Sequence, residues 1–402
     1  MWVIFCLTTI LYSVEIPLIN VAIYRVIYPV AAMLYFILGY GRAHNWHIQR
    51  TSPIWNTVLC YIFIAFCGLL LAVLNGTLVY SWSYIWYMVC FACVVYVISC
   101  FFRNPQKEKL GLGFVFLFSS LVALSGIYES VTGNYYHLTH ISYLHRKNMF
   151  GLYRPNTIFY NVNDSAVFMC MMLVLAYFFA ERCTKRGGLI RLISLAHYGG
   201  NILLTESRGA LFGAVIFLYI YNVLYKNVKK RVVLVIMLLP VILSGVIWLA
   251  SIFDVSDFNL EDMGGRGIVW RKSLHNLWGS FLLGTGPGMT RVLNATTDTF
   301  GAGVSDIHSF FLEVLCDYGL PGGGALIIWY GHLLVRSRKR KNFHKNFLIS
   351  LAALVAFIPV SVSSSSLLGK VWVLCFFGVL IAEVNNADRD VLNMSKRDIL
   401  FM

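Results

Sequence analysis

Residues 54–74 read IWNTVLCYIFIAFCGLLLAVL, a stretch without a single charged side chain. About 20 mostly apolar residues are enough to cross the hydrocarbon core of a bilayer as an α-helix. The stretch must be helical there, because lipid offers no partner to an unsatisfied backbone N–H or C=O group. It therefore predicts a transmembrane helix.

Stretches of the same kind recur along the whole chain of 402 residues, which is 58% hydrophobic and only 12% charged. An average soluble domain is about 25% charged. We predict about twelve spans, near residues 2–14, 18–40, 54–74, 79–102, 110–130, 161–182, 188–207, 209–225, 231–253, 317–336, 346–364 and 366–384. The sequence thus predicts an all-α polytopic membrane protein with one helical domain over residues 1–402. The first residues lack the basic segment and cleavage site of a signal peptide, so we expect no cleavage.

Positive charge is distributed unevenly between alternate connectors. Six connectors together hold 21 lysines and arginines, at 41–53, 103–109, 182–187, 226–231, 336–345 and 385–402. The connectors between them hold nine, at 75–78, 131–160, around 208, 251–316 and 365–370. The positive-inside rule places the first set in the cytoplasm. The net charge of +14 is therefore interpreted as a topology signal, and no nucleic-acid partner is expected.

The two long polar loops, 131–160 and 251–316, then share the outer face with Arg208. We expect the larger loop to contain short helices and the active site. Nucleotide-dependent chemistry is not expected on that face, and the chain has no phosphate-binding G-x-x-x-x-G-K-[ST] sequence. Neither an H-E-x-x-H sequence nor a paired cysteine and histidine pattern is present, so we predict no metal and no other cofactor.

His308 is the candidate catalytic base. Ser305 and Asp306 before it are residue types that favour helix N-caps. Apolar residues follow it at helical spacing, which predicts that His308 lies in the first turn of a helix. The helix dipole disfavours an imidazolium there, and a neutral imidazole can accept a proton from a hydroxyl. The alternative is an ordinary interfacial histidine, with three acids as rival bases or orienting groups: Asp306, Glu313 and Asp317.

Three arginines on the same predicted face are candidates for binding an anionic lipid headgroup. Arg208 lies between two apolar stretches, and an arginine at bilayer depth costs about 2.5–3.5 kcal/mol. It either faces a cavity, or it snorkels or pairs with Glu206. The guanidinium groups of Arg266 and Arg271 suit phosphate oxygens in a bidentate geometry, although a solvated surface is the alternative.

Two further features of the larger loop leave alternatives open. Trp270 either anchors the loop at the membrane interface or stacks on a sugar ring. The glycine run 284–288 resembles a phosphate-binding turn only loosely, because no strand precedes it and no α/β unit surrounds it. A tight turn is the preferred interpretation.

The chain resembles the O-antigen polymerase and O-antigen ligase superfamily, multi-span enzymes of bacterial surface-polysaccharide assembly. The similar segments are Tyr128–Asn134, Asn161–Asp164, Thr205–Ala210, Arg266–Gly288, His308–Ser309 and Asp317–Gly319. Asn161 and Asn163 match a family Asn-Pro-Asn motif in which Val162 replaces proline. Ser309 stands where the family usually has asparagine.

The resemblance implies a metal-independent, inverting glycosyl transfer from an undecaprenyl-diphosphate carrier at the outer face of the cytoplasmic membrane. Arg208 would bind the diphosphate with Arg266 and Arg271 as helpers, and His308 would act as the base or position the acceptor. Secondary roles fall to Asp306, Glu313, Asp317, Asn161, Asn163 and Trp270. Implied partners are the lipid-linked glycan, membrane lipid, and chain-length regulator and flippase proteins.

Three activities remain open at this stage. The 131–160 loop favours a polymerase of capsular, exo- or O-antigen polysaccharide. A ligase that transfers the glycan to lipid A-core is the first alternative. A transporter of lipid-linked sugars is the second, although transporters favour repeated halves with broken helices, and one large outer loop favours an enzyme.

Overall fold

The computed structural model describes residues 52–102, 105–135, 147–159, 161–183, 185–226, 266–296, 306–339, 345–364 and 367–400. It also describes residues 30 and 34 and two short strands, β1 (Glu15–Ile16) and β2 (Val21–Ala22), which pair antiparallel. The predicted spans at 2–14, 18–40 and 231–253 lie wholly or largely outside these residues.

Nearly all of the described chain is helical. The helices are α3 (Pro53–Leu74), α4 (Leu78–Phe101), α5 (Pro105–Thr132), α6 (Val162–Arg182), α7 (Gly187–Ser194), α8 (Gly200–Thr205), α9 (Arg208–Lys226), α11 (Arg266–Gly279), α12 (Met289–Thr296), α13 (Phe310–Lys339), α14 (Lys345–Val360) and α15 (Val371–Leu400). A π-helical turn (Leu195–Gly199) joins α7 to α8, and a 3₁₀ turn (Leu367–Gly369) precedes α15.

The predicted class, an all-α membrane protein, is confirmed. Within the described residues, five helices are long and apolar enough to cross a membrane: Pro53–Leu74, Leu78–Ser99, Gln106–Thr132, Val162–Arg182 and Phe310–Ser337. Shorter apolar helices cover Arg208–Asn222, Leu348–Val360 and Trp372–Asn386. The described residues do not establish the predicted number of twelve spans.

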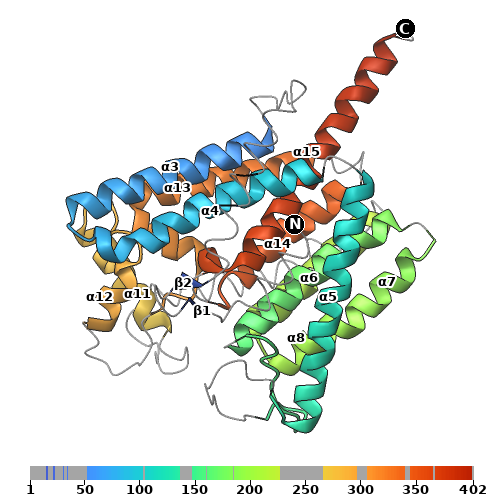
Figure 1. Cartoon of the computed structure of the whole chain (residues 1–402), viewed down its shortest axis with the longest axis horizontal. Helices are drawn as coiled ribbons and strands as arrows, with labels where there is room; N and C mark the ends of the chain where they lie inside the picture. Colours follow the sequence, from blue (N-terminus) through green and yellow to red (C-terminus); the bar gives the residue numbers. More distant parts are fainter. Residues whose placement is uncertain are drawn as a thin grey trace.

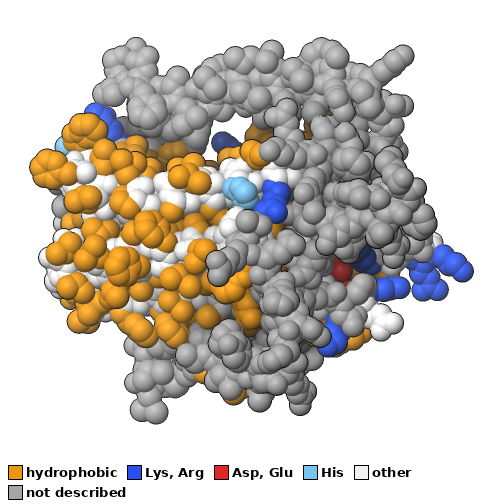
Figure 2. Space-filling view, turned by 90° about the horizontal axis from the view of Figure 1, so that it is seen from above, with side chains coloured by type: hydrophobic (Ala, Val, Ile, Leu, Met, Phe, Trp, Pro, Cys, Tyr) orange, Lys and Arg blue, Asp and Glu red, His pale blue; other side chains and the backbone are white. Residues whose placement is uncertain are grey.

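Helix α6 lies at the centre of the packing. It contacts α5, α7, α8, α9, α14 and α15, and almost every side chain from Asp164 to Phe178 is buried. Figure 1 shows α3, α4 and α13 side by side in the other half of the molecule, in agreement with their contacts. Outward-facing residues such as Phe66 and Ile328 are exposed and apolar, and Figure 2 shows a broad hydrophobic face of the kind that lipid would cover.

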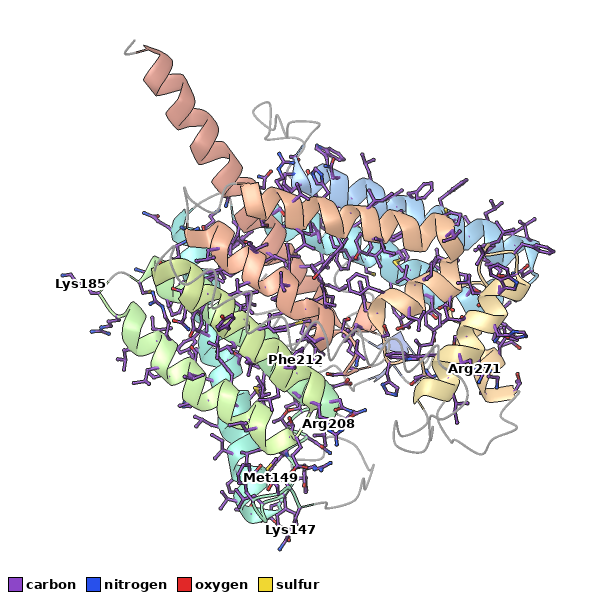
Figure 3. The ribbon with its side chains drawn as sticks, turned by 180° about the vertical axis from the view of Figure 1, so that it is seen from behind. Lys147, Met149, Lys185, Arg208, Phe212 and Arg271 are labelled. Carbon is purple, nitrogen blue, oxygen red and sulfur yellow. The ribbon has the colours of Figure 1, made fainter. Side chains whose placement is uncertain are left out.

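The connectors divide between two ends of the bundle, as the charge alternation requires. At one end, the Asn75 amide donates to Thr285 O and the Phe310 N–H to Ser361 O. We call this the loop end. The described parts of its connectors are residues 75–78, 133–135, 147–159, 206–208, 266–296, 306–309, 361–364 and 367–370. At the other end, Asn386 donates to Phe102 O. Figure 3 shows Arg208 and Lys147 at the loop end and Lys185 at the opposite end.

Helices α9 and α14 approach each other closely through two glycines spaced four residues apart. A Cβ atom at Gly209 would lie 2.2 Å from Ser363 Oγ, and one at Gly213 would lie 2.2 Å from Val360 Cγ2 and 2.8 Å from Ala356 O. Small residues at this spacing allow membrane helices to pack backbone to backbone. The glycines thus fix the position of Arg208, the first residue of α9.

We predict that Gly213→Ala lowers the free energy of unfolding by about 1–3 kcal/mol, because the added methyl group overpacks the α9–α14 contact. The measurement is chemical unfolding of the purified protein in detergent. Gly331→Ala is the matched control, since a Cβ there would have no atom within 4 Å. Equal stability of the two variants would contradict the close helix contact.

Candidate functional site

The connector between α14 and α15 joins the starts of three helices at the loop end. The Phe310 N–H, at the start of α13, donates to Ser361 O (3.2 Å). Ser363 Oγ lies against Gly209 in the first turn of α9. Ser364 donates a hydrogen bond to the carboxylate of Asp164 in the first turn of α6. We call residues Ser361–Ser364 the serine turn, because all three helices contact it.

Arg208 is exposed at the start of α9, and no acidic side chain of the described residues pairs with it. The pairing with Glu206 considered from the sequence is not formed. Glu206 instead binds the Arg154 guanidinium and accepts the Met149 N–H (2.6 Å). Because the start of a helix also carries partial positive charge, the surroundings of Arg208 favour an anion.

His308 lies two residues before α13, so its predicted place in the first helical turn is wrong. Its φ of 50° is left-handed rather than helical. Ser309 takes the capping position instead, because its carbonyl accepts the Glu313 N–H (2.8 Å). A non-glycine residue in this region costs about 1–3 kcal/mol. Such strain persists only where the surrounding contacts determine the conformation.

Contacts on both sides hold the His308 segment. The Trp270 indole N–H donates to Ile307 O at 2.5 Å. Arg291 pairs with Asp306, with 2.9 Å between Nε and Oδ1. Burial alone would lower the pKa of Arg291, but the nearby Asp306 carboxylate raises this pKa above its usual value, so the guanidinium stays charged. His308 is therefore presented, half-buried, from a segment fixed by its neighbours.

Trp270 has a packing role. It is only 6% exposed and lies in a small apolar cluster with Val269, Leu277, Ile307 and Cys316. Its one N–H group is used by Ile307. These contacts favour a packing role, and the two roles predicted from the sequence, anchoring at the interface and stacking on a sugar, stay predictions.

The three acids near His308 differ in their surroundings. Asp306 is paired with Arg291. Glu313 faces a small polar recess that Tyr84 and Arg291 also line. Asp317 is 2% exposed, and its carboxylate accepts the Gly288 N–H (2.8 Å) and the Thr290 N–H (3.2 Å). These bonds favour a structural role for Asp317 over that of a rival base.

The glycine run packs against a break in α13. The helix is interrupted at Gly319, where φ is 66°, and Pro321 follows. The freed carbonyls of Cys316 and Asp317 accept the N–H groups of Thr285 and Gly286, both at 3.0 Å. A Cβ at Gly284 would lie 2.5 Å from Gly319 N. The run is thus the tight turn preferred from the sequence, and four of its N–H groups, from Gly284, Thr285, Gly286 and Gly288, donate to oxygen atoms of the protein.

The other predicted arginines lie on α11. Arg271 is exposed, with no acidic partner among the described side chains. Figure 3 shows it at the loop end together with Arg208. Arg266 is the first residue of α11, but its side chain lies outside the described part of the structure. Two candidate cations therefore share this end of the bundle.

The Asn161–Asp164 motif starts α6. Asn161 is the N-cap, and its side chain accepts the Asn163 N–H (2.9 Å). Val162 is the first helical residue, a position that proline favours because its missing N–H has no helical partner to lose. The valine therefore keeps the helix start that a family proline would give, and Asn161 acts as the cap.

Sequence reasoning missed Lys370 and the role of Asp164. The Lys370 ammonium pairs with the Asp164 carboxylate, and both residues are buried, at 4% and 7% exposure. One signal was available: a charged residue at the membrane edge of a serine run requires a partner. Among the described residues, no group of three His, Cys, Asp or Glu side chains could hold a metal ion.

Two comparisons relate the chain to known proteins. Residues 192–327 match the family model described as O-antigen ligase, a region that contains Arg208, Arg271 and His308. The chain is also 24% identical to the teichuronic acid biosynthesis protein TuaE of Bacillus subtilis (strain 168), over 93% of this chain and 80% of that protein. The resemblance to the O-antigen polymerase and ligase superfamily is confirmed. The chain is therefore similar to polysaccharide-biosynthesis proteins of the ligase and polymerase type.

We predict that Gly319→Ala destabilises the loop end far more than Gly76→Ala does. Both glycines have a positive φ, of 66° and 65°, so an alanine is strained at either position by about 1–2 kcal/mol or more. At Gly319 the ψ of −170° also places the backbone in a region that is almost exclusive to glycine. Only at Gly319 would the new Cβ meet a backbone atom, Leu283 O, at 2.1 Å, whereas none lies within 4 Å at Gly76.

The measurements are the free energy of unfolding in detergent and limited proteolysis within residues 282–290. We expect faster cleavage of this segment in Gly319→Ala alone. Equal effects of the two variants on both measurements would rule out the packing of the glycine run on the helix break.

Proposed function

We propose that the chain polymerises oligosaccharide repeat units carried on undecaprenyl diphosphate, with the loop end on the outer face of the cytoplasmic membrane. One observation carries the proposal. Arg208, without an acidic partner among the described residues, and the segment bearing His308 both adjoin the serine turn. An anion site and a proton acceptor at one turn suit the transfer of a glycan from a diphosphate to a hydroxyl.

The geometry limits how far apart the two groups sit. Gly209 contacts Ser363, and Phe310 bonds to Ser361. Residues two apart in a chain span at most about 7 Å. Arg208 and His308 each lie within two residues of these contacts, so we infer that both border one substrate-binding region.

The proposed reaction forms one glycosidic bond and breaks one bond to phosphate. His308 accepts the proton of the acceptor hydroxyl, and that oxygen attacks the anomeric carbon. The bond from this carbon to the diphosphate oxygen breaks, and the diphosphate leaves with the electron pair and inversion of configuration. Arg208, helped by Arg271 and Arg266, stabilises the leaving charge, which is worth several kcal/mol in a site that excludes water.

A ligase is the second candidate, because the matched family model is described as O-antigen ligase. Polymerase is preferred because of the sequence of the 131–160 loop, and the relative named for teichuronic acid biosynthesis is compatible with either activity. The acceptor separates the two activities: a polymerase lengthens a lipid-linked repeat unit supplied alone, whereas a ligase needs a separate acceptor such as lipid A-core. A flippase would supply the substrate and a chain-length regulator would limit the product.

We predict that Arg208→Ala slows chain growth from purified lipid-linked repeat units by about 10²–10³-fold, the usual effect of removing a group that stabilises transition-state charge. Arg208→Lys should not restore the rate, because an ammonium cannot bind a diphosphate in the bidentate manner of a guanidinium. Arg186→Ala is the control, since Arg186 is also an exposed arginine before a helix but lies at the other end of the bundle. A wild-type rate of chain growth in Arg208→Lys would show that Arg208 contributes only its positive charge.

We predict that His308→Ala lowers the turnover number by about 10²–10⁴-fold, the usual contribution of a general base. Protein yield and unfolding temperature should stay near those of the wild type. Product length is read on a gel. The exposed His275 on α11 provides the matched control as His275→Ala. Polymer of normal length and amount from His308→Ala would end the assignment of His308 as base, while movement of substrate without lengthening would identify a flippase.

A further inference from the structure

A buried ion pair holds the serine turn in place through Ser364. Asp164, in the first turn of α6, pairs with Lys370, the residue that precedes α15. The Lys370 ammonium also donates to Ser364 Oγ at 2.5 Å, and Ser364 in turn bonds to the Asp164 carboxylate. Three side chains, one from α6 and two from the connector before α15, thus close one network at the base of the turn.

Such a pair is a costly way to join helices. Removing two charges from water costs several kcal/mol per ion, and a well-packed apolar pair is often as stable or more stable. What an ion pair adds is a defined geometry, because only one arrangement of the partners satisfies both charges. The position of Asp164 and Lys370 therefore points to a need for order in the serine turn.

The serine turn contacts the neighbours of both candidate site residues. Ser361 O binds the N–H of Phe310, two residues after His308. Ser363 Oγ, buried and without a hydrogen-bond partner among the described residues, lies against the residue after Arg208. A displacement of the turn would move these two contacts, and with them the relative position of guanidinium and imidazole.

We propose that Asp164 and Lys370 are positioning residues for glycosyl transfer. Through the serine turn, their ion pair sets the separation between Arg208 and His308, and neither residue touches the substrate. This inference rests on the proposed function. Misplacement of reacting groups by about 1 Å can cost about 10²-fold in rate, so the effect belongs in the turnover number rather than in substrate binding.

A second buried charge cluster provides the matched control. Arg182 pairs with Glu108 and, at 2.9 Å, with the fully buried Glu383. This cluster also joins α6 to α15 but lies at the end opposite the loop end. Lys370→Met and Arg182→Met each leave buried carboxylate charge unpaired. They therefore compare the same type of damage near the proposed site and far from it.

The test measures turnover number, KM for the lipid-linked repeat unit, and unfolding temperature for the purified full chain. We expect Lys370→Met to lower the turnover number by about 10²-fold with KM changed less than about threefold. Arg182→Met should lose stability with the turnover number unchanged. The double variant Asp164→Asn/Lys370→Met should regain stability but not turnover. If the two methionine variants lose turnover in proportion to stability, the pair is merely structural and the inference fails.

Two additions keep the result decisive. If Lys370→Met does not fold, Ser364→Ala replaces it. This variant removes the hydrogen bond between the turn and Asp164 but leaves the ion pair intact, and we expect the same loss of turnover number. Hydrogen exchange of residues 306–311 and 361–364 needs no activity, and we expect it to accelerate in Lys370→Met. Faster exchange in Lys370→Met, together with a wild-type chain that makes no polymer, would overturn the proposed function but keep the coupling. Unchanged exchange with unchanged turnover would overturn the coupling itself.

Discussion

The break in α13 at Gly319 is the constraint on which the loop end depends. A backbone carbonyl without a partner in a membrane costs several kcal/mol, and the break leaves the carbonyls of Cys316 and Asp317 outside the helix pattern. The glycine run supplies the missing N–H donors, and the Asp317 side chain binds the far end of that run. Because the loop provides the hydrogen-bond donors for these carbonyls, it cannot move freely. Helices α11 and α12 are therefore fixed against α13.

The charged side chains at the loop end divide into two groups. Glu206 and Asp306 are each committed to an arginine, and Asp164 to Lys370. Arg208 and Arg271, by contrast, have no acidic partner among the described residues. The three acids already pair with other cations, so they do not neutralise Arg208 and Arg271. The surface that would attract a diphosphate therefore keeps its positive charge.

Much of the fold follows from composition and charge. Helices α3 to α6, α9 and α13 to α15 coincide with predicted spans because lipid permits only one backbone solution for a long apolar stretch. The grouping of Arg208 with the large loop came from counting charges alone. Helical spacing misplaced His308, because the contacts of Trp270 and Ser361 with its neighbours override the local preference for a helix. Those contacts join residues 37 or more positions apart, which no local pattern reveals.

The serine turn is a second feature that could not be recognised from the sequence. Its residues carry no charge and match no motif, yet three helix starts meet on it. The matched family region, 192–327, contains Arg208 and His308 but neither Asp164 nor Lys370. The residues that would touch the substrate and the residues that hold them in place thus lie in different parts of the chain. A site of this kind depends on α6 and α15 as closely as on the loops that carry its chemistry, because a displaced turn would separate groups that are individually intact.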